Sequence, residues 1–502
     1  MLQKVQVCAL AVAVFACVLT LADSSRASLQ TQTQQAGPPT ASALEGKIQR
    51  IENGLLPPTR IKGEQATGMR LLDRMQFYKS PAVSIAVINE GRIEWARAYG
   101  TLEAGGKVPA TITTVFQAAS LSKPVTAMAV LRLVQQGKLN LDTDVNGSLK
   151  SWRVPDNEFT RTQKVTLRRI LSHSAGLTIS GFLGYASDAP VPTLLQILDG
   201  TPPANSQPIR VDLMPGTKFR YSGGGYVVLQ QLLTDVTGKP FPDLLEQLVL
   251  RRLRMDHSKF LQPVPQRLAS NMAAGHLPNG QTIKGGYFRY PELAPAGLWT
   301  TPTDLAQFVI ECQRSLHGKS EKVLSRELTR QMLTPQIENS GLGLFVDGLD
   351  RAPRFSHSGS NVGFKSYLVG YIDSGQGAVV MTNSENGAQL ILEVLRSIAA
   401  EYKWPDFQPR ERVISKLDPS IYDAYAGDYE VAPGLILTVT KEGDRLFSQS
   451  PGQSRSEMLP ESETTFFLRD IDAQFTFVRE RGQTIRVSIR RGAREFQARK
   501  IK

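Results

Sequence analysis

The chain has 502 residues, of which 41% are hydrophobic and 21% are charged. This is ordinary globular usage, so a mainly disordered, collagen-like or coiled-coil protein is excluded. Lys and Arg number 58 against 46 Asp and Glu, and a net charge of +12 spread over this length is weak evidence for an anionic partner. We therefore expect no nucleic-acid partner. Of the three cysteines, Cys8 and Cys17 lie in an N-terminal apolar stretch. A chain without that stretch keeps only Cys312 and cannot form an internal disulfide.

The first 27 residues have the pattern of a secretory signal peptide. Lys4 supplies a short positive region, residues 5–21 are almost wholly apolar, and residues 25–27 offer small side chains at the positions that a signal peptidase reads. We expect an exported protein, periplasmic or secreted. The alternative is that the stretch is kept as an N-terminal membrane anchor. No second segment is long and apolar enough to span a bilayer, so we expect no membrane span in the mature chain.

The next segments change from tether to strand. Residues 28–45 are rich in Gln, Thr, Ser, Gly and Pro, and we interpret them as a disordered tether, because this composition cannot bury enough apolar surface to order itself. Residues 82–88 then alternate in hydrophobicity, residues 89–91 have the composition of a turn, and residues 92–99 alternate again. This pattern predicts a β-hairpin.

Helical spacing of apolar residues occupies the middle of the chain, between about residues 165 and 333. Beyond it, residues 367–372 and 378–382 are predicted to be two strands, and residues 389–402 an amphipathic helix. Strands therefore flank the helical part at both ends. The simplest closure is an α+β fold over residues 46–405, in which an antiparallel sheet is flanked by helices and carries an inserted helical subdomain.

The C-terminal part has the pattern of a separate small domain. Residues 406–419 carry charge and proline and are predicted to be a linker, whereas residues 420–502 alternate between strand and turn patterns and indicate a small antiparallel β-domain. Residues 477–502 contain nine Lys or Arg and two Asp or Glu. Arg486 and Arg490 share one face of a strand whose other face is apolar. We interpret that face as solvated; the alternative is a site for an anionic polymer.

Ser120 and Lys123 form a Ser-x-x-Lys motif where a predicted helix begins. Residues three apart on a helix lie on the same face, so hydroxyl and amine can meet. A serine becomes a good nucleophile when a neighbour takes its proton, and a lysine whose pKa is depressed can do so. The helix N-terminus adds free N–H groups for an oxyanion. By itself the motif is weak, and the alternative is a capping serine followed by a surface lysine.

Two further segments favour a catalytic role for Ser120 and Lys123 over the alternative of a capping serine and a surface lysine. One places Tyr221 on a glycine-rich loop just before a helix, and the other places His357, Ser358 and Gly359 just before a strand. With these three ordered motifs the chain resembles the serine β-lactamases and D-alanyl-D-alanine peptidases, especially the class C-like branch that also holds esterases and D-amino-acid amidases. The resemblance covers about residues 48–404. It includes three accessory stretches, at residues 171–177, 295–299 and 382–384.

The resemblance implies roles for the matching residues. Ser120 would be the nucleophile, and Lys123 and Tyr221 would move its proton, with Tyr221 acting as a base only if nearby cations depress its pKa. His357 would stand where other members have a lysine, polarising the tyrosine or holding a substrate carboxylate. The oxyanion hole would use the backbone N–H groups of Ser120 and Ser360. Ser358, Gly359 and Gly223 would lie against the substrate.

One residue departs from the family pattern. Where the second motif usually ends in asparagine, this chain has Gly223, which has no side-chain amide to bind the acylamide of a substrate. We therefore expect poor recognition of β-lactams and acyl-D-Ala-D-Ala, and an exported serine hydrolase that acts through an acyl-enzyme on another ester or amide. The substrate class is a small molecule or a peptide, with cell-wall peptides among the candidates.

Three other classes of protein compete with the serine hydrolase hypothesis. An α/β-hydrolase needs Gly-x-Ser-x-Gly, and residues 172–176 lack the first glycine. A metalloenzyme needs clustered ligands, but the five histidines are scattered, so neither metal nor other cofactor is expected; His173 is interpreted as a loop or helix-end residue. A non-catalytic relative that binds cell-wall material or forms an assembly should have lost Ser120, Lys123 or Tyr221, and all three are present.

Overall fold

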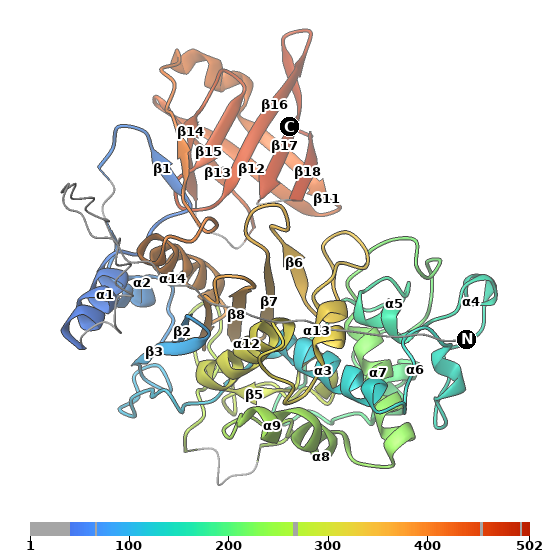
Figure 1. The fold of residues 1–502 in the computed structure, drawn as a ribbon. Coiled ribbons are helices and arrows are strands. Elements are labelled where there is room, and N and C mark those ends of the chain that lie inside the picture. The colour runs from blue at the N-terminus through green and yellow to red at the C-terminus, as the bar shows by residue number, and fades with distance from the viewer. Residues whose placement is uncertain (1–40, 66–67, 265–269, 452–454, 492–493) are drawn as a thin grey trace, which may run out of the picture. The chain divides into compact units, whose positions relative to one another are not determined.

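The computed structural model describes residues 41–65, 68–264, 270–451, 455–491 and 494–502 (Figure 1). The predicted signal peptide, with its alternative as an anchor, and most of the predicted tether lie outside the described residues. Helix α1 (Ala41–Asn53) begins inside the segment assigned to the tether, because Ile48 and Ile51 give it a buried apolar side. Within the described ranges, no helix has both the length and the hydropathy needed to cross a membrane.

A six-stranded antiparallel sheet forms the centre of the larger domain, in the order β3-β2-β9-β8-β7-β6. Its strands are β2 (Ala82–Asn89), β3 (Arg92–Gly100), β6 (Phe345–Asp347), β7 (Arg354–Asn361), β8 (Phe364–Tyr371) and β9 (Gly377–Thr382). Strand β2 pairs with β9 in a register that places Ile85 opposite Val380. The predicted hairpin and the predicted closure of both sequence ends in one sheet are confirmed.

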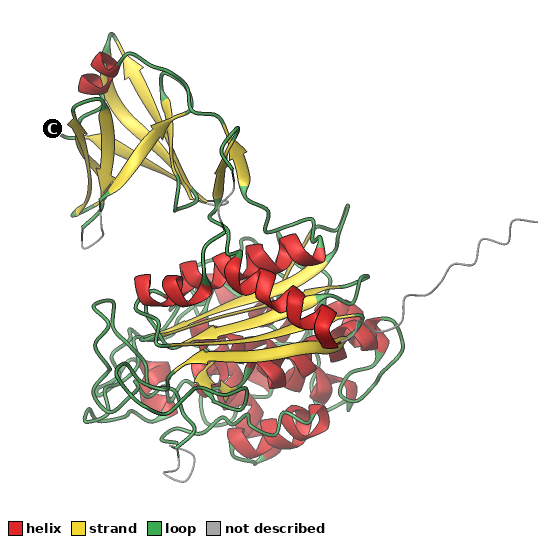
Figure 2. Ribbon diagram, turned by 90° about the vertical axis from the view of Figure 1, so that its left-hand side faces the viewer, coloured by secondary structure: helices red, strands yellow, loops and turns green. Residues whose placement is uncertain are grey.

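Helices cover both faces of this sheet (Figure 2). Helix α14 (Gly387–Tyr402) packs on β8 and β9 from one side, next to α2 (Leu71–Phe77). Helix α12 (Pro302–Leu316) packs on β2, β8 and β9 from the other side, with α13 (Arg326–Met332) beside it. All six residues of β9 are buried. Two covered faces explain why the central strands have nearly continuous apolar sequences.

The helical subdomain lies between β3 and β6 in the sequence. Its elements are β4 (Phe116–Gln117), η1 (Ala119–Leu121), α3 (Ser122–Gln135), η2 (Val145–Gly147), α4 (Glu158–Thr162), α5 (Leu167–Leu171), α6 (Leu194–Asp199), α7 (Gly223–Thr237), α8 (Phe241–Leu245), the π-helical turn η3 (Glu246–Leu250), α9 (Arg251–Leu253), α11 (Leu293–Ala296) and β5 (Trp299–Thr300). Helix α7 is bounded by its caps: the Ser222 hydroxyl accepts the Gly225 N–H, and Gly238 adopts the left-handed conformation at the other end.

The third motif lies in a strand that was not predicted. His357, Ser358 and Gly359 lie inside β7, and they also precede β8, which corresponds to the strand predicted at residues 367–372. The reason is that Phe355 is the only large apolar residue among the eight residues of β7, so the alternation of hydrophobic residues that marks a strand is missing.

The predicted linker contains a strand. Residues 406–419 include β10 (Arg410–Arg412), which pairs in parallel with β1 (Thr59–Ile61) and places Thr59 opposite Arg410. Three residues rich in charge give no alternation from which such a strand could be recognised.

The C-terminal β-domain is a closed barrel of eight strands (Figure 1). The prediction of a small antiparallel β-domain is confirmed. The strands are β11 (Gly427–Ala432), β12 (Leu435–Glu442), β13 (Arg445–Gln449), β14 (Ser456–Pro460), β15 (Thr465–Leu468), β16 (Ala473–Glu480), β17 (Gln483–Arg491) and β18 (Arg494–Lys500), with the short 3-10 helix η4 (Pro419–Ala424) before them. Strand β18 pairs with β11 and closes the barrel. Arg486 and Arg490 lie on the exposed face of β17, as their alternation predicts.

Candidate active site

Ser120 lies in the single 3-10 turn η1, which leads directly into α3. The Ser122 hydroxyl fixes this turn: it donates to the Ala119 carbonyl oxygen at 2.6 Å and accepts the N–H of Leu298 at 3.0 Å. Ala119 has a φ of 51°, a left-handed conformation that is uncommon for a residue with a side chain. A strained residue held next to a polar side chain is typical of a functional site.

Lys123 and Ser120 are in contact. The amine of Lys123 donates to the Ser120 hydroxyl at 2.9 Å and to the carbonyl oxygen of Pro295 in α11 at 3.0 Å. Only 2% of Lys123 is exposed. Burial disfavours the charged amine and lowers the pKa of Lys123 to about 7. A lysine of this kind is half deprotonated near neutral pH and can accept the proton of the serine.

Tyr221 lies directly before α7, with its ring centroid 4.9 Å from the Lys123 amine. Burial raises the pKa of Tyr221 above its usual value, while a hydrogen bond with Ser120 acts in the opposite direction. The condition for Tyr221 to act as a base, a pKa depressed by nearby cations, is therefore not met. The physical reason is that Lys123, the cation invoked, itself loses its charge near pH 7 because it is buried. Tyr221 is a neutral hydroxyl in the free protein.

His173 packs against the ring of Tyr221, a role that the sequence reasoning missed. Its ring lies against the Tyr221 ring with centroids 4.3 Å apart, and its Nδ1 accepts the N–H of Ser222 at 3.1 Å. His173 has a φ of 57° and is 3% exposed, in the loop that follows α5. Burial holds its pKa well below the usual value, so the ring is uncharged. The only signal in the sequence was its place in the accessory stretch 171–177.

His357 is buried and neutral. Its Nδ1 lies 2.7 Å from the carbonyl oxygen of Ser358 and must donate to it, which leaves Nε2 as a lone-pair acceptor. Burial, with a smaller effect of Lys123, lowers the pKa of His357 to about 3. Nε2 is buried without a partner among the described residues, and the ring lies 6.1 Å from that of Tyr221. A neutral ring brings no positive charge to a substrate carboxylate, so the structure does not favour the expectation that His357 holds one.

The part of β7 that carries Ser358, Gly359 and Ser360 lies beside the turn that carries Ser120. Strand β6 pairs with β7 only as far as Ser356, and η1 contacts β7 directly. Gly359 is required for this approach, because a Cβ at that position would collide with the carbonyl oxygen of Ala118 and the hydroxyl of Ser366. Ser358 and Ser360 are exposed at this edge. The structure thus brings the third motif to the nucleophile.

Asn361 ties these elements together and is a second residue that sequence reasoning missed. Its amide donates to the Gln117 side-chain oxygen at 2.8 Å and to the Ala296 carbonyl oxygen at 3.2 Å. Ala296 follows Pro295, whose carbonyl binds Lys123. Asn361 therefore fixes the end of β7 relative to α11.

Gly223 is the first residue of α7, and its surroundings are closed. Its N–H donates to the Ser180 carbonyl oxygen at 3.2 Å. A Cβ at position 223 would lie 3.1 Å from the Phe182 ring and 3.2 Å from that same oxygen, closer than most side chains approach. The position that lacks the asparagine amide is thus bordered by an aromatic ring.

Ser174, the serine of the α/β-hydrolase alternative, is not placed as a nucleophile. Ser174 is 5% exposed, and its hydroxyl lies 3.0 Å from that of Ser172. Among the described residues, no group of three or more His, Cys, Asp or Glu side chains is arranged to hold a metal ion.

Comparison with known proteins decides the family. The family model described as Beta-lactamase matches residues 70–401. The chain belongs to the beta-lactamase family. Residues 411–502, which form the barrel and the strand before it, match a family described as Domain of unknown function (DUF3471). The resemblance inferred from the three motifs is therefore confirmed.

Relatives agree with this assignment. Penicillin-binding protein 4* of Bacillus subtilis (strain 168) is 24% identical over 415 residues, which cover 77% of this chain and 88% of the relative. The structure of the octameric penicillin-binding protein homologue from Pyrococcus abyssi has a TM-score of 0.58 at 21% identity and covers 85% of this chain and 98% of its own. The D-amino acid amidase from Ochrobactrum anthropi SV3, complexed with L-phenylalanine amide, has a TM-score of 0.54 at 20% identity, covering 71% and 99%. The two structures establish the fold, and the family is consistent with a serine hydrolase.

Proposed function

We propose that this chain is a serine hydrolase that acts through an acyl-enzyme on a neutral ester or amide, with Ser120 as the nucleophile. One observation carries the proposal: the Lys123 amine is 2.9 Å from the Ser120 hydroxyl and its pKa is lowered to about 7. A base with a pKa near the working pH is the most effective general base. A capping serine followed by a surface lysine does not explain a lysine that is 2% exposed.

The proton route uses the neutral states of the three side chains. Lys123 takes the proton of Ser120 while the serine oxygen bonds to the substrate carbonyl carbon. Tyr221 donates its proton to the leaving group as the scissile bond breaks, and it is restored by the proton on Lys123. In the second half-reaction water attacks the carbonyl carbon of the acyl-enzyme, and the proton transfers run in the reverse order. The raised pKa of Tyr221 keeps the side chain protonated at neutral pH, which is the state that a proton donor requires.

Backbone N–H groups are proposed to stabilise the oxyanion. Ser120 provides one from η1, and Ser360 provides one from the edge of β7 beside it. Donors fixed by secondary structure need no reorganisation when charge develops on the substrate oxygen. Gly359 serves by letting the two segments approach.

The substrate class follows from His357 and Gly223. His357 stands where other family members have a lysine, and as a neutral ring it brings no positive charge to pair with a substrate carboxylate. A Cβ at position 223 would lie 3.1 Å from the Phe182 ring, so the ring crowds the position that carries an asparagine in other members. We therefore favour a neutral ester, or an amide without a free carboxylate next to the scissile bond, over a carboxypeptidase substrate. Cell-wall peptides fit this site only in such a form. Export to the periplasm or medium remains part of the proposal, on the basis of residues 1–27 alone.

Hydrolysis of p-nitrophenyl butyrate tests the proposal. The unmodified protein should release p-nitrophenol with saturation kinetics, and Ser120→Ala should lose all but the residual rate. Ser374→Ala, at an exposed turn between β8 and β9, is the matched control and should keep full activity. Equal rates for Ser120→Ala and the unmodified protein would rule out Ser120 as the nucleophile.

A further inference from the structure

One end of the C-terminal barrel is filled with aromatic rings and the other is hollow. At the filled end the Tyr425 and Phe477 rings stack with centroids 4.4 Å apart, and Phe466 packs edge-on against both. An eight-stranded barrel has an interior that is either just filled by side chains or able to hold one small ligand. This barrel does both, at opposite ends.

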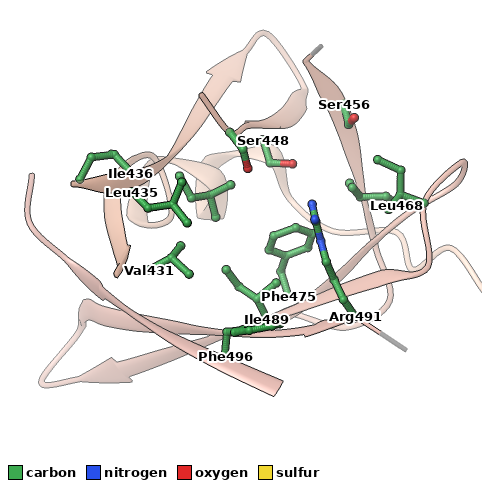
Figure 3. A pocket seen from close by; sticks show the side chains of 13 residues that line it. Val431, Leu435, Ile436, Ser448, Ser456, Leu468, Phe475, Ile489, Arg491 and Phe496 are labelled. Carbon is green, nitrogen blue, oxygen red and sulfur yellow. The ribbon is translucent and has the colours of Figure 1, made fainter. Parts of the chain in front are cut away.

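The hollow end contains a cavity of about 180 Å³ (Figure 3). Its deep wall is apolar and belongs to the barrel core: Leu437, Phe475 and Ile489 are at most 6% exposed. The space exists because small residues, Ser448 and Ser456, occupy inward positions at this end. For scale, a dry apolar cavity of about 150 Å³ binds benzene. The cavity can therefore take a ring or a short alkyl chain.

The mouth of the cavity carries exposed apolar side chains. Leu435 is 45% exposed and Phe496 is 40% exposed, and both line the cavity. Large apolar side chains that face both a cavity and solvent extend the apolar surface on which a ligand can lie. Leu435 is the first residue of β12 and Phe496 the third of β18, and both continue the inward-facing series of their strands.

A single charge faces this apolar space. Val487, Ile489 and Arg491 alternate along β17, so Arg491 falls at an inward position, whereas Arg490 points outward. Figure 3 shows the Arg491 side chain extending into the cavity, toward the side that carries Ser448. Among the described residues, no carboxylate pairs with the Arg491 guanidinium. An unpaired guanidinium at the mouth of an apolar cavity is complementary to an anion that carries an apolar group.

We propose that this end of the barrel is a binding site for a small amphipathic anion, whose apolar body fills the cavity and whose carboxylate or similar head pairs with Arg491. The Ser448 and Ser456 hydroxyls line the same cavity and can donate to the head. The site is independent of the proposed hydrolase, because all its residues belong to the barrel and its occupation is measured by binding.

Calorimetric titration of the full chain with octanoate, octanol and octylamine tests the site. The three probes share one apolar tail and differ in charge. Octanoate should bind about tenfold more tightly than either of the others, a difference of about 1.4 kcal/mol. Octanol or octylamine binding as tightly as octanoate would overturn the assignment of an anion site, and absence of binding by all three would overturn the site itself.

Two arginine variants locate the binding. Arg491→Met should weaken octanoate about tenfold and leave octanol within about twofold, because it removes the charge and keeps an apolar side chain. Arg490→Met is the matched control, one residue away on the outer face of the same strand, and should leave both affinities unchanged. Octanoate affinity that is insensitive to Arg491→Met, or equally sensitive to both variants, would place the binding elsewhere and overturn the proposal.

A third variant tests the apolar part of the site. Ser456→Phe puts a ring at an inward position of the hollow end and should abolish binding of octanoate and octanol alike. Thermal unfolding of each variant checks that the barrel remains folded, and the exposed position of Arg491 makes its substitution safe for the core. Unchanged octanoate binding in a folded Ser456→Phe protein would exclude the cavity.

Discussion

The amine of Lys123 lies 4.9 Å from the centre of the Tyr221 ring, and burial shifts the pKa values of the two side chains in opposite directions. It lowers the pKa of Lys123 to about 7 and raises that of Tyr221. Opposite shifts from one cause assign the two roles: the lysine is the base, and the tyrosine is the acid.

The pH dependence of acylation should follow from this assignment. Lys123 accepts a proton only when it is deprotonated, so kcat/KM should fall about tenfold per pH unit below pH 7 and level off above it. Tyr221, with its raised pKa, and His357, with a pKa of about 3, should add no second step between pH 5 and 9. Steady-state kinetics with p-nitrophenyl butyrate across this range measures the profile. A rate that falls as pH rises through 7 would mean that the charged lysine is the active form.

Lys123 and Tyr221 should behave as one unit. Lys123→Ala and Tyr221→Phe should each slow acylation by about 100-fold or more, as loss of general acid–base catalysis does. The double variant should be little worse, because both residues belong to one proton relay that fails when either is removed. Single-turnover kinetics of the two single variants and the double variant provides the measurement, and a fully multiplicative loss would argue that they do not share a step.

A free carboxylate next to the scissile bond should hinder the reaction. The matched substrates are an acyl-D-alanyl-D-alanine peptide and the same peptide with its C-terminal carboxylate converted to a carboxamide. The carboxamide should be the better substrate, because the neutral His357 supplies no positive charge to pair with a carboxylate. His357→Lys, which introduces the residue of other family members, should reverse the order. Preference of the unmodified protein for the free acid would contradict the neutral histidine.

The glycine at position 223 should bias the enzyme against β-lactams. Nitrocefin should be turned over with a lower kcat/KM than p-nitrophenyl butyrate, because the amide that would bind its acylamide is absent. One hydrogen bond contributes about 0.5 to 1.5 kcal/mol, so restoring it should raise nitrocefin turnover roughly threefold to tenfold.

The crowding by Phe182 determines which variant restores the bond. Gly223→Asn alone should give no gain, because its side chain would meet the Phe182 ring at 3.1 Å. Gly223→Asn combined with Phe182→Ala should give the gain, and Phe182→Ala alone is the control. A gain from Gly223→Asn alone would show that the aromatic ring does not occupy this space.

Much of the site was predictable because its residues lie at fixed spacings on regular elements. Ser120 and Lys123 meet because residues three apart lie about one helical turn from each other. Tyr221 lies just before α7, whose first residues are glycines, as the sequence predicted. The hairpin of β2 and β3 was predictable from alternation alone.

What escaped prediction depends on tertiary contacts. His173 supports Tyr221 through a backbone N–H that belongs to a segment 49 residues away, which no local pattern records. The pKa of Tyr221 depends on how deeply the side chain is buried, so the direction of its shift could not be derived from the sequence. The hollow end of the barrel depends on which inward positions face each other across eight strands.

The central claim is that Ser120 forms the acyl-enzyme, and covalent labelling tests it most directly. The full-length protein is treated with a fluorophosphonate and with a labelled penicillin, digested, and mapped by mass spectrometry. The fluorophosphonate should add to Ser120 and to no other serine, Ser120→Ala should abolish the adduct, and Ser374→Ala should retain it, while the penicillin should label the same serine only weakly. A fluorophosphonate adduct on Ser122 or Ser174, or an adduct that survives in a folded Ser120→Ala protein, would contradict the account.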